Sequence, residues 1–384
     1  MSDNSQTPAE PAPPDYVNDI REDRAGNSSR CQYRFEQHLY WEPYGGYVTG
    51  KLCGYPVAGQ GTLCCFHSGQ TASPSLKHDL EEAARLGACM FEACLAGASL
   101  KGAILSDAWM WHADLSRAIL EDTKFGRAHL GGAVFRGAYL PRATFSGADA
   151  PEARFDDADL RKARFDDHAR LEKCTFRRTL MYGAMLRPGI DLDGVEWAET
   201  DPYCARERLL DETLARDDAG WQDYCAAGHC VARPTLAHAE RIYRQIKLCY
   251  QHSGRYDEAG QFFVREMECQ RAQLKSPFAR GVYGLLYLLS DYFENWMRVA
   301  VIGLIVIVIG ALFQGLCGIR TSPKGEFVVG PGIGSGPPTW ASVRDAVYFS
   351  VVTFTTTGYG DYVPNRGVGQ VLASIEAIFA SAPA

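Results

Sequence analysis

The most regular pattern of apolar positions in this chain has a period of five residues. Every fifth residue is large and apolar, and the residue two positions earlier is Ala from Ala88 to Ala163, with Thr123 the only departure. The large position holds Met90, Leu95, Leu100, Leu105, Met110, Leu115, Leu120, Phe125, Leu130, Phe135, Leu140, Phe145, Phe155, Leu160 and Phe165, with Ala150 as the one small exception. One inserted residue then shifts the frame, and Leu171, Phe176, Met181 and Leu186 continue it. Because five fits neither a helix nor a flat strand, the pattern predicts a coil whose large residues and alanines point inward.

This pattern resembles the pentapeptide-repeat family, whose fold is a right-handed quadrilateral β-helix. The resemblance implies that residues 88–186 form about five stacked coils around a ladder of Leu and Phe. Some family members are similar in shape to DNA and bind topoisomerases through an acidic surface. Residues 88–186 carry 13 Asp and Glu against 14 Lys and Arg, which removes the acidic field that such mimicry needs. A rigid spacer, or a docking surface for a protein partner, is therefore the favoured role.

The N-terminal part of the chain has a different composition. Residues 1–30 are rich in Pro, Ser, Asn and Asp, which predicts a disordered tail. Residues 31–75 are dense in aromatic residues, Gly and Cys, which predicts a small module. Zinc prefers thiolate and imidazole ligands, and the module offers Cys31, Cys53, Cys64 (or Cys65) and His67. The alternative is a β-rich module with ordinary buried thiols. Residues 76–87 show helical periodicity after the start signal Ser75 and are expected to form a helix that caps the coils.

Residues 187–275 are expected to form a linker that ends in a helical hairpin. Gly254 separates two helical patterns, as a helix C-cap and turn require. The expected buried faces are Ile242, Ile246 and Cys249 on the first helix and Ala259, Phe263 and Met267 on the second. The hairpin resembles a single tetratricopeptide-like unit. Since one such unit cannot form a solenoid, we expect it to pack on the end of the coils or to pair with copies of itself.

The next segments have the composition of membrane-associated helices. Residues 276–296 combine apolar residues with Tyr, Phe and Trp, which predicts a helix at the bilayer surface. The run 299–317 has a single polar residue, Gln314, and approaches the ~20 residues that a span needs. We therefore predict a transmembrane helix over about 298–318. Arg280 and Arg298 favour a cytoplasmic location for its N-terminal side.

Composition narrows the function classes. The formal net charge of −7 argues against a general nucleic-acid partner. The 13 cysteines are scattered and odd in number, and the polar, Pro-rich N-terminus does not read as a secretory signal, so we expect most thiols to be reduced and cytosolic. No nucleophile–base or paired-carboxylate arrangement stands out, so an enzyme is not predicted.

A short apolar helix precedes a glycine-containing motif near the C-terminus. Residues 319–339 are rich in Gly and Pro and read as a loop, and residues 340–355 are apolar but too short to span. The helix runs into TTTGYGD at residues 355–361, and a partial second span follows at residues 367–384. Irregular backbone at membrane depth is tolerated where it lines a water-filled cavity. This arrangement resembles the two-transmembrane potassium-channel family, so we expect a pore domain over residues 297–384.

That resemblance implies specific roles for the motif. Carbonyl and hydroxyl oxygens of the filter would replace the water of a dehydrated K⁺, the permeant ion, and the filter residues are Thr356, Thr357, Gly358, Tyr359 and Gly360. One loop supplies a quarter of each oxygen ring, so a homotetramer is implied. Asp361 would add negative charge outside, and Tyr348 and Phe349 match the family's aromatic cuff. Because Val352 stands where some members have Glu, we hypothesise that Tyr348 donates a hydrogen bond to Asp361 instead.

Two functions are compatible with these features. The first is a tetrameric potassium channel of the plasma membrane, multi-pass and without a voltage sensor, whose cytoplasmic β-helix is an accessory domain. The second is a membrane-tethered pentapeptide-repeat scaffold with a non-conducting pore. Residues 368–384 cover roughly 25 Å as a helix, somewhat short of the ~30 Å hydrocarbon core. Either this second span is truncated or the pore is incomplete, and the channel remains the preferred hypothesis.

Overall fold

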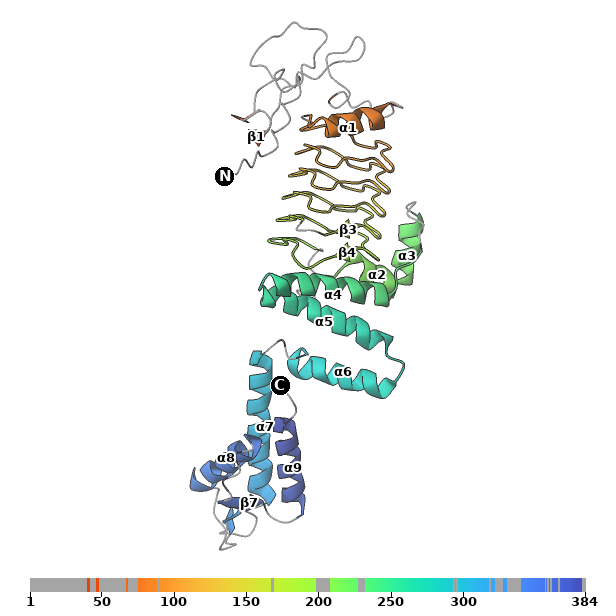
Figure 1. Cartoon of the computed structure of the whole chain (residues 1–384). Coiled ribbons are helices and arrows are strands. Elements are labelled where there is room, and N and C mark those ends of the chain that lie inside the picture. The colour runs from red at the N-terminus through yellow and green to blue at the C-terminus, as the bar shows by residue number, and fades with distance from the viewer. Residues whose placement is uncertain are drawn as a thin grey trace, which may run out of the picture. The chain divides into compact units, whose positions relative to one another are not determined.

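The computed structural model describes two compact units, residues 1–273 and 274–384, which we treat separately (Figure 1). The described residues are 40–41, 46–47, 67, 75–88, 90–166, 169–197, 208–226, 232–292, 294, 296–317, 319–321, 327–329, 340–355, 357, 359, 361–364 and 367–381. A short antiparallel pair, β1 (Tyr40–Trp41) and β2 (Gly46–Tyr47), lies in the N-terminal module.

Parallel backbone bridges build the first unit into stacked coils. Cys94 pairs with Asp114, Asp114 with Val134, and Val134 with Arg154, each bridge joining residues 20 apart. After the inserted residue the spacing becomes 21, as in the bridge between Arg154 and Thr175. One pair of bridging segments is long enough to form strands, β3 (Arg164–Phe165) and β4 (Met185–Leu186). Each coil therefore consists of four fives, and the insertion widens one coil without breaking the stack.

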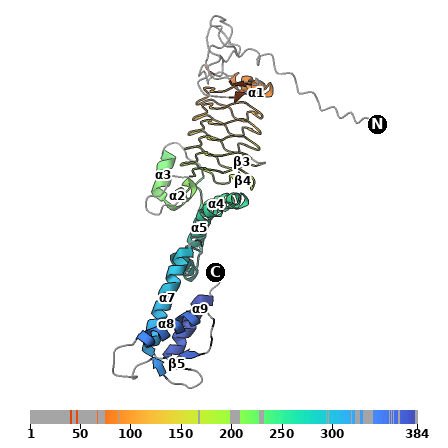
Figure 2. The same ribbon diagram turned by 90° about the vertical axis from the view of Figure 1, so that its left-hand side faces the viewer.

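The large residues and the alanines of the fives form the core of the coils, as their spacing predicts. The large residues are 0–3% exposed from Met90 to Leu186. The aromatic members stack in two columns, and neighbouring columns meet edge to face. One column joins Phe125, Phe145 and Phe165, with ring centroids 5.1 and 4.8 Å apart. The other joins Phe135, Phe155, Phe176 and Trp197 at 4.8–5.1 Å. Figure 2 shows the stacked coils side-on.

Two departures from Ala at the small position are explained by hydrogen bonds to the preceding coil. Thr123 Oγ1 donates to the Leu100 carbonyl at 2.9 Å, and Thr179 Oγ1 donates to the Phe155 carbonyl at 2.7 Å. Each acceptor is the large residue of a five one coil earlier. A buried hydroxyl is tolerated there because it finds a partner.

The coils continue beyond residue 186, where the sequence pattern placed their end. Bridges join Arg170 to Asp191 and Thr175 to Glu196. Leu192 and Trp197 occupy the large position and are 4% and 1% exposed. The expected boundary was wrong because a second residue is inserted and the small position changes from Ala to a branched residue, first Ile190 and then Val195.

Helices cover both ends of the coils (Figures 1 and 2). At one end, α1 (Leu76–Arg85) buries Leu76, Leu80 and Ala83 in the same core. At the other end lie α2 (Leu210–Arg216), α3 (Asp218–Tyr224), α4 (Leu236–His252) and α5 (Tyr256–Gln273). The Gln245 side chain accepts a hydrogen bond from Leu186 N at 2.8 Å, and Trp197 Nε1 donates to Tyr250 Oη at 3.0 Å. The hairpin α4–α5 therefore packs on the end of the coils, the first of the two expected arrangements.

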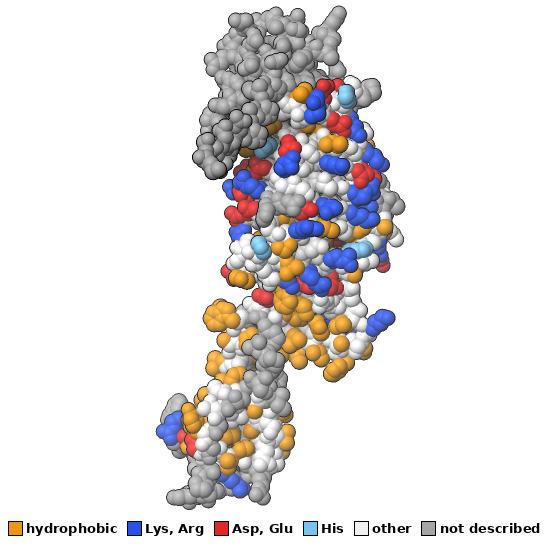
Figure 3. Space-filling view, in the orientation of Figure 1, with side chains coloured by type: hydrophobic (Ala, Val, Ile, Leu, Met, Phe, Trp, Pro, Cys, Tyr) orange, Lys and Arg blue, Asp and Glu red, His pale blue; other side chains and the backbone are white. Residues whose placement is uncertain are grey.

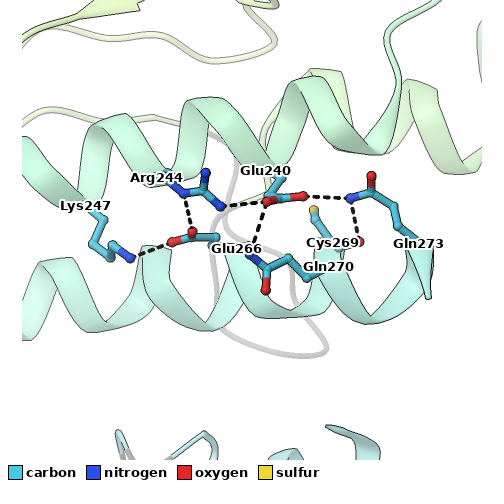
Figure 4. A network of polar contacts seen from close by, with 7 residues as sticks. All are labelled: Glu240, Arg244, Lys247, Glu266, Cys269, Gln270 and Gln273. Atoms are coloured by element: carbon cyan, nitrogen blue, oxygen red, sulfur yellow. Dashed lines mark hydrogen bonds and ion pairs between the residues drawn. The ribbon is translucent and has the colours of Figure 1, made fainter. Parts of the chain in front are cut away.

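A polar network determines which face of α5 meets α4 (Figure 4). Glu266 accepts from Arg244 Nε at 2.7 Å and from Lys247 Nζ at 2.6 Å, and its side chain is 5% exposed. This contact turns Phe262 and Cys269 into the interface together with Ala259. The expected face with Phe263 and Met267 was wrong, because both residues are only partly buried. Phe263 instead lies under the Lys247 ammonium group, and Lys247 Nζ is 4.9 Å from the centroid of the Phe263 ring.

The carboxyl group of Asp211 gives the first unit a pH-dependent stability. Asp211 is fully buried in α2 and accepts a hydrogen bond from Met181 N at 2.8 Å. Burial raises the pKa of Asp211 from 3.8 to about 7. The folded state therefore holds a proton that the unfolded state releases, so this group's contribution is largest near pH 4 and is lost as the pH rises to 7.

We therefore expect Asp211→Asn to remove that slope from thermal unfolding curves of the full chain between about pH 4 and pH 7. Asp223→Asn, at an exposed position of α3, is the matched control and should retain the wild-type slope. Equal pH dependence of Asp211→Asn and the wild type would contradict the prediction.

The described residues of the second unit form four helices and a small sheet. The helices are α6 (Pro277–Ser290), α7 (Trp296–Cys317), α8 (Trp340–Phe354) and α9 (Val368–Ser381). The strands β5 (Ile319–Thr321), β6 (Phe327–Val329) and β7 (Tyr362–Pro364) form an antiparallel sheet in the order β6-β5-β7. On the face in Figure 3, hydrophobic side chains dominate the described surface of this unit, whereas charged side chains cover the coils.

Candidate functional site

The helix that precedes the TTTGYGD motif packs against two others. α7 contacts both α8 and α9, and α8 contacts α9. Phe349 and Ala346 of α8 pack with Ala311 of α7 and Ile319 of β5, and Tyr362 and Ala373 lie against this cluster. Burial of one apolar face of α8 in this cluster fixes the place from which the motif begins.

The motif starts as a continuation of α8. Thr355 N donates to the Val351 carbonyl at 2.8 Å, and Thr357 N donates to the Val352 carbonyl at 3.1 Å. The hydroxyl groups of Thr355 and Thr357 are 2.8 Å apart. Thr357 therefore contributes a hydrogen bond where the family commonly has Val. Tyr359 is 72% exposed in this single chain, and Thr356, Gly358 and Gly360 lie outside the described residues.

The sheet ties the far end of the motif to the end of α7. Tyr362 pairs with Thr321 and Pro364 pairs with Ile319. β5 follows α7 after a single residue, so its position depends on α7. Both ends of the TTTGYGD segment are thus attached to α7, one through α8 and the other through β5.

The residues expected to support the motif lie beside it. Tyr348 and Asp361 lie close enough to interact, and the hydrogen bond hypothesised from Val352 stays a prediction. The Tyr348 ring meets the Tyr362 ring edge to face, with centroids 5.8 Å apart. Phe349 differs from Tyr348 because it is 6% exposed within the chain and belongs to the cluster between α7 and α8.

Three buried polar residues in this unit were not predicted to belong to the site. Gln314 of α7 donates to the Gly369 carbonyl of α9 at 3.2 Å. Ser350 of α8 contacts both the Ile307 carbonyl of α7 and the Glu376 carboxyl group of α9. The available signal was the presence of Gln314 and Glu376 in otherwise apolar runs, because polar side chains at membrane depth commonly face other helices.

The zinc site expected in the N-terminal module stays a prediction. His67 is buried and its Nε2 lies 2.9 Å from the Phe91 carbonyl, so its ring contacts the first coil. Cys31, Cys53 and Cys64 lie outside the described residues. Among the described residues, no group of three His, Cys, Asp or Glu side chains is arranged to hold a metal ion.

One helix in the described part of the chain is long and apolar enough to cross a membrane, over Trp296–Gln314. Most of its side chains are exposed in the single chain, which is unlike the buried core helix of a soluble domain. α9 contains a shorter apolar stretch, Val368–Ala377.

Family models match both units. Residues 325–382 match the model described as "Ion channel", and residues 93–132 and 130–175 match models described as "Pentapeptide repeats". The chain therefore joins pentapeptide repeats to an ion channel domain, a combination of two families that are not families of enzymes.

Particular relatives match short regions. Potassium voltage-gated channel subfamily KQT member 1 is 48% identical to the chain over 46 residues in both Felis catus and Homo sapiens. The match covers 12% of this chain and only 7–8% of those channels. A pentapeptide repeat protein from the thylakoid lumen of Arabidopsis thaliana is 22% identical with a TM-score of 0.15, covering 34% of this chain and 70% of that one. QnrB1, a plasmid-mediated fluoroquinolone resistance protein, is 18% identical with a TM-score of 0.17, covering 37% of this chain and 86% of that one.

Proposed function

We propose that the chain is a subunit of a tetrameric, potassium-selective channel without a voltage sensor. The observation that carries this proposal is the TTTGYGD motif, which leaves the C-terminal end of α8 while α8 packs against α7 and α9. Consecutive carbonyls of residues 356–360 from four chains would form rings of oxygen atoms around K⁺. The glycines at 358 and 360 suit this role because Gly adopts backbone angles that other residues avoid.

A pore needs a favourable place for a cation, and α8 can supply one. The partly negative C-terminal end of a helix stabilises nearby positive charge, and in this chain it is the end from which the motif begins. In a tetramer, exposed apolar residues of α8 and α9 such as Val347, Val351 and Val371 would be covered by neighbouring subunits or lipid.

The proposed topology has two membrane crossings, α7 and α9, with the N-terminal units in the cytoplasm at the plasma membrane. α6 would lie at the bilayer surface. Its exposed apolar side chains recur at helical spacing: Phe278, Val282, Leu285 and Leu288 are 80, 40, 51 and 68% exposed. A helix with one such face binds the interface between headgroups and acyl chains.

For the first unit we infer a right-handed quadrilateral β-helix that serves as an accessory domain and docks a protein partner. Its described charges of both signs pair along the stack, for example Arg142 with Asp122 at 2.7 Å and Arg178 with Asp157 at 2.9 Å. Such a mixed surface does not provide the acidic field that a DNA mimic needs. A zinc ion in the N-terminal module remains part of the proposal.

The function is tested by flux through purified protein in liposomes. We expect wild-type protein to take up Rb⁺ in preference to Na⁺, and Gly358→Ala to reduce Rb⁺ uptake to the level of empty vesicles. Ala disfavours the backbone angles of the filter, so the carbonyl ring is lost. The matched control is Gly281→Ala on α6, where an added Cβ meets nothing within 4 Å.

Equal Rb⁺ uptake by wild type and Gly358→Ala would exclude a selective filter at this motif. Well-folded wild-type protein that shows no uptake would favour the alternative, a membrane-tethered scaffold that acts through its β-helix.

A further inference from the structure

Ser350 makes buried polar contacts that join the three helices α7, α8 and α9. Ser350 Oγ lies 2.8 Å from the Ile307 carbonyl of α7 and also contacts the Glu376 carboxyl group of α9. Ser350 is 0% exposed and Glu376 is 4% exposed. The contact of Ser350 with Glu376 is therefore a specific polar link between α8 and α9.

A glycine in α7 provides the space for this link. A Cβ added at Gly310 would lie 2.6 Å from both Glu376 Oε1 and Ser350 Oγ. Real Cβ atoms do not approach other atoms this closely. The Glu376 carboxyl group therefore occupies a hollow that only glycine leaves open on the surface of α7.

The two contacts of Ser350 limit where a proton can lie between Ser350 and Glu376. Ser350 has a single hydroxyl hydrogen, and both the Ile307 carbonyl and the Glu376 carboxyl oxygen lie within its reach as acceptors. Both contacts are full hydrogen bonds at the same time only if the Ser350 hydroxyl donates to Ile307 and the carboxyl group supplies the hydrogen between Glu376 and Ser350. Glu376 fits this requirement when it is a neutral carboxylic acid that donates to Ser350 Oγ.

The charges on the neighbouring elements agree with a neutral acid. On the helices packed against Glu376, Arg298 of α7 pairs with Asp291 at 3.9 Å and Arg344 of α8 pairs with Asp345 at 2.9 Å. No described salt bridge involves Glu376, and its Oε2 has no partner among the described residues. An ionised carboxylate in such a site is strongly disfavoured when it has no cation.

We propose that Glu376, as a protonated acid, is a positioning residue that holds the pore helix α8 against the inner helix α9 and thereby fixes the start of the filter. Ser350 lies one helical turn before Phe354, where α8 ends. The next two residues, Val351 and Val352, accept the backbone hydrogen bonds of Thr355 and Thr357. A shift of α8 at Ser350 would therefore move the first residues of the filter. The effect on selectivity rests on the proposed function, whereas the protonation of Glu376 does not.

The test compares Glu376→Gln with Glu376→Ala in the full chain. A Gln amide has nearly the shape of the acid and donates the same hydrogen bond to Ser350, so this variant should keep the wild-type ratio of Rb⁺ to Na⁺ uptake. Glu376→Ala and Ser350→Ala lose the bond and should lower the ratio by up to about tenfold, the scale of one buried hydrogen bond. Ser374→Ala is the matched control on α9, because Ser374 is exposed and bonds only to the Gln370 carbonyl of its own helix, at 2.9 Å.

Infrared difference spectroscopy of the same proteins tests the proton without any need for conduction. We expect the C=O stretching band of one protonated carboxylic acid to be present in the wild type and Ser374→Ala and absent from Glu376→Gln. Spectra of wild type and Glu376→Gln that show no such difference would overturn the protonated acid. A wild-type uptake ratio in Glu376→Ala would overturn the positioning role. If the band is present but the wild type does not conduct, the proposed function fails while the protonated contact stands.

Discussion

Replacing Phe145 with Ala should lower the free energy of unfolding of the β-helix by about 3–5 kcal/mol. The Phe145 ring is 0% exposed and has four aromatic neighbours. It stacks on Phe125 and Phe165 at 5.1 and 4.8 Å, and it meets Phe135 and Phe155 edge to face at 6.1 and 5.7 Å. Ala removes one ring from the column of Phe125 and Phe165, together with its edge-to-face contacts to the other column. A cavity remains, because backbone bridges on either side prevent the coils from collapsing into it.

Chemical denaturation of the full chain in detergent, followed by circular dichroism in the aromatic region, measures this loss. The matched control is Tyr139→Ala, which removes a ring of similar size from the outside of the stack, where Tyr139 is 38% exposed. We expect the control to change stability by less than about 1 kcal/mol. Similar losses for the two variants would show that the stacked rings do not dominate the stability of the coils.

Replacing Gly310 with Ala should destabilise the ion channel domain by about 1–3 kcal/mol and abolish uptake of Rb⁺. The added methyl group would lie 2.6 Å from Glu376 Oε1 and Ser350 Oγ, and 2.7 Å from Glu376 Cδ. These atoms are buried, so they cannot move into solvent. Either α7 separates from α9 or the contact between Ser350 and Glu376 breaks, and each change displaces α8. Gly310→Val should have the same effect with greater severity.

A Gly-to-Ala substitution elsewhere on α7 distinguishes the effect of the steric clash from the effect of Ala on helix propensity. At Gly303 an added Cβ would be 3.3 Å from Phe354 Cζ, the far edge of a ring that can adjust. Gly303→Ala should therefore keep the wild-type thermal stability and Rb⁺ uptake. The measurements are thermal stability in detergent and Rb⁺ flux in liposomes, and equal behaviour of Gly303→Ala and Gly310→Ala would contradict the steric role assigned to Gly310.

Local pattern was sufficient to predict the coils. A repeat of five places one large and one small apolar residue inward at every side, and backbone bridges join equivalent residues of successive coils. The inserted residue after Phe165 was visible as a change of frame and appears as a change in bridge spacing from 20 to 21. The end of the stack was missed because Ile190 and Val195 break the Ala pattern while still filling the same inward position.

The sequence predicted the TTTGYGD motif of the candidate site, but only some of the residues that support this motif. Tyr348, Phe349 and Asp361 were identified by resemblance, and the hydrogen bond from Tyr348 to Asp361, hypothesised from Val352, stays a prediction. The bond between Thr355 and Thr357 and the pairing of β7 with β5 were not predicted. Both depend on how the backbone leaves α8, which composition and periodicity do not specify.

The repeats, the apolar span and the channel motif can be located from the amino-acid sequence, because each is defined by residues close together along the chain. Which residues far apart in the sequence meet depends on how the helices and coils pack. The rotation of α5 follows from the contact of Glu266 with Arg244 and Lys247, since Phe262 and Phe263 are equally apolar choices. The contact of Glu376 with Ser350 needs the hollow at Gly310, and a glycine in an apolar run looks the same whether or not a carboxyl group occupies the space beside it.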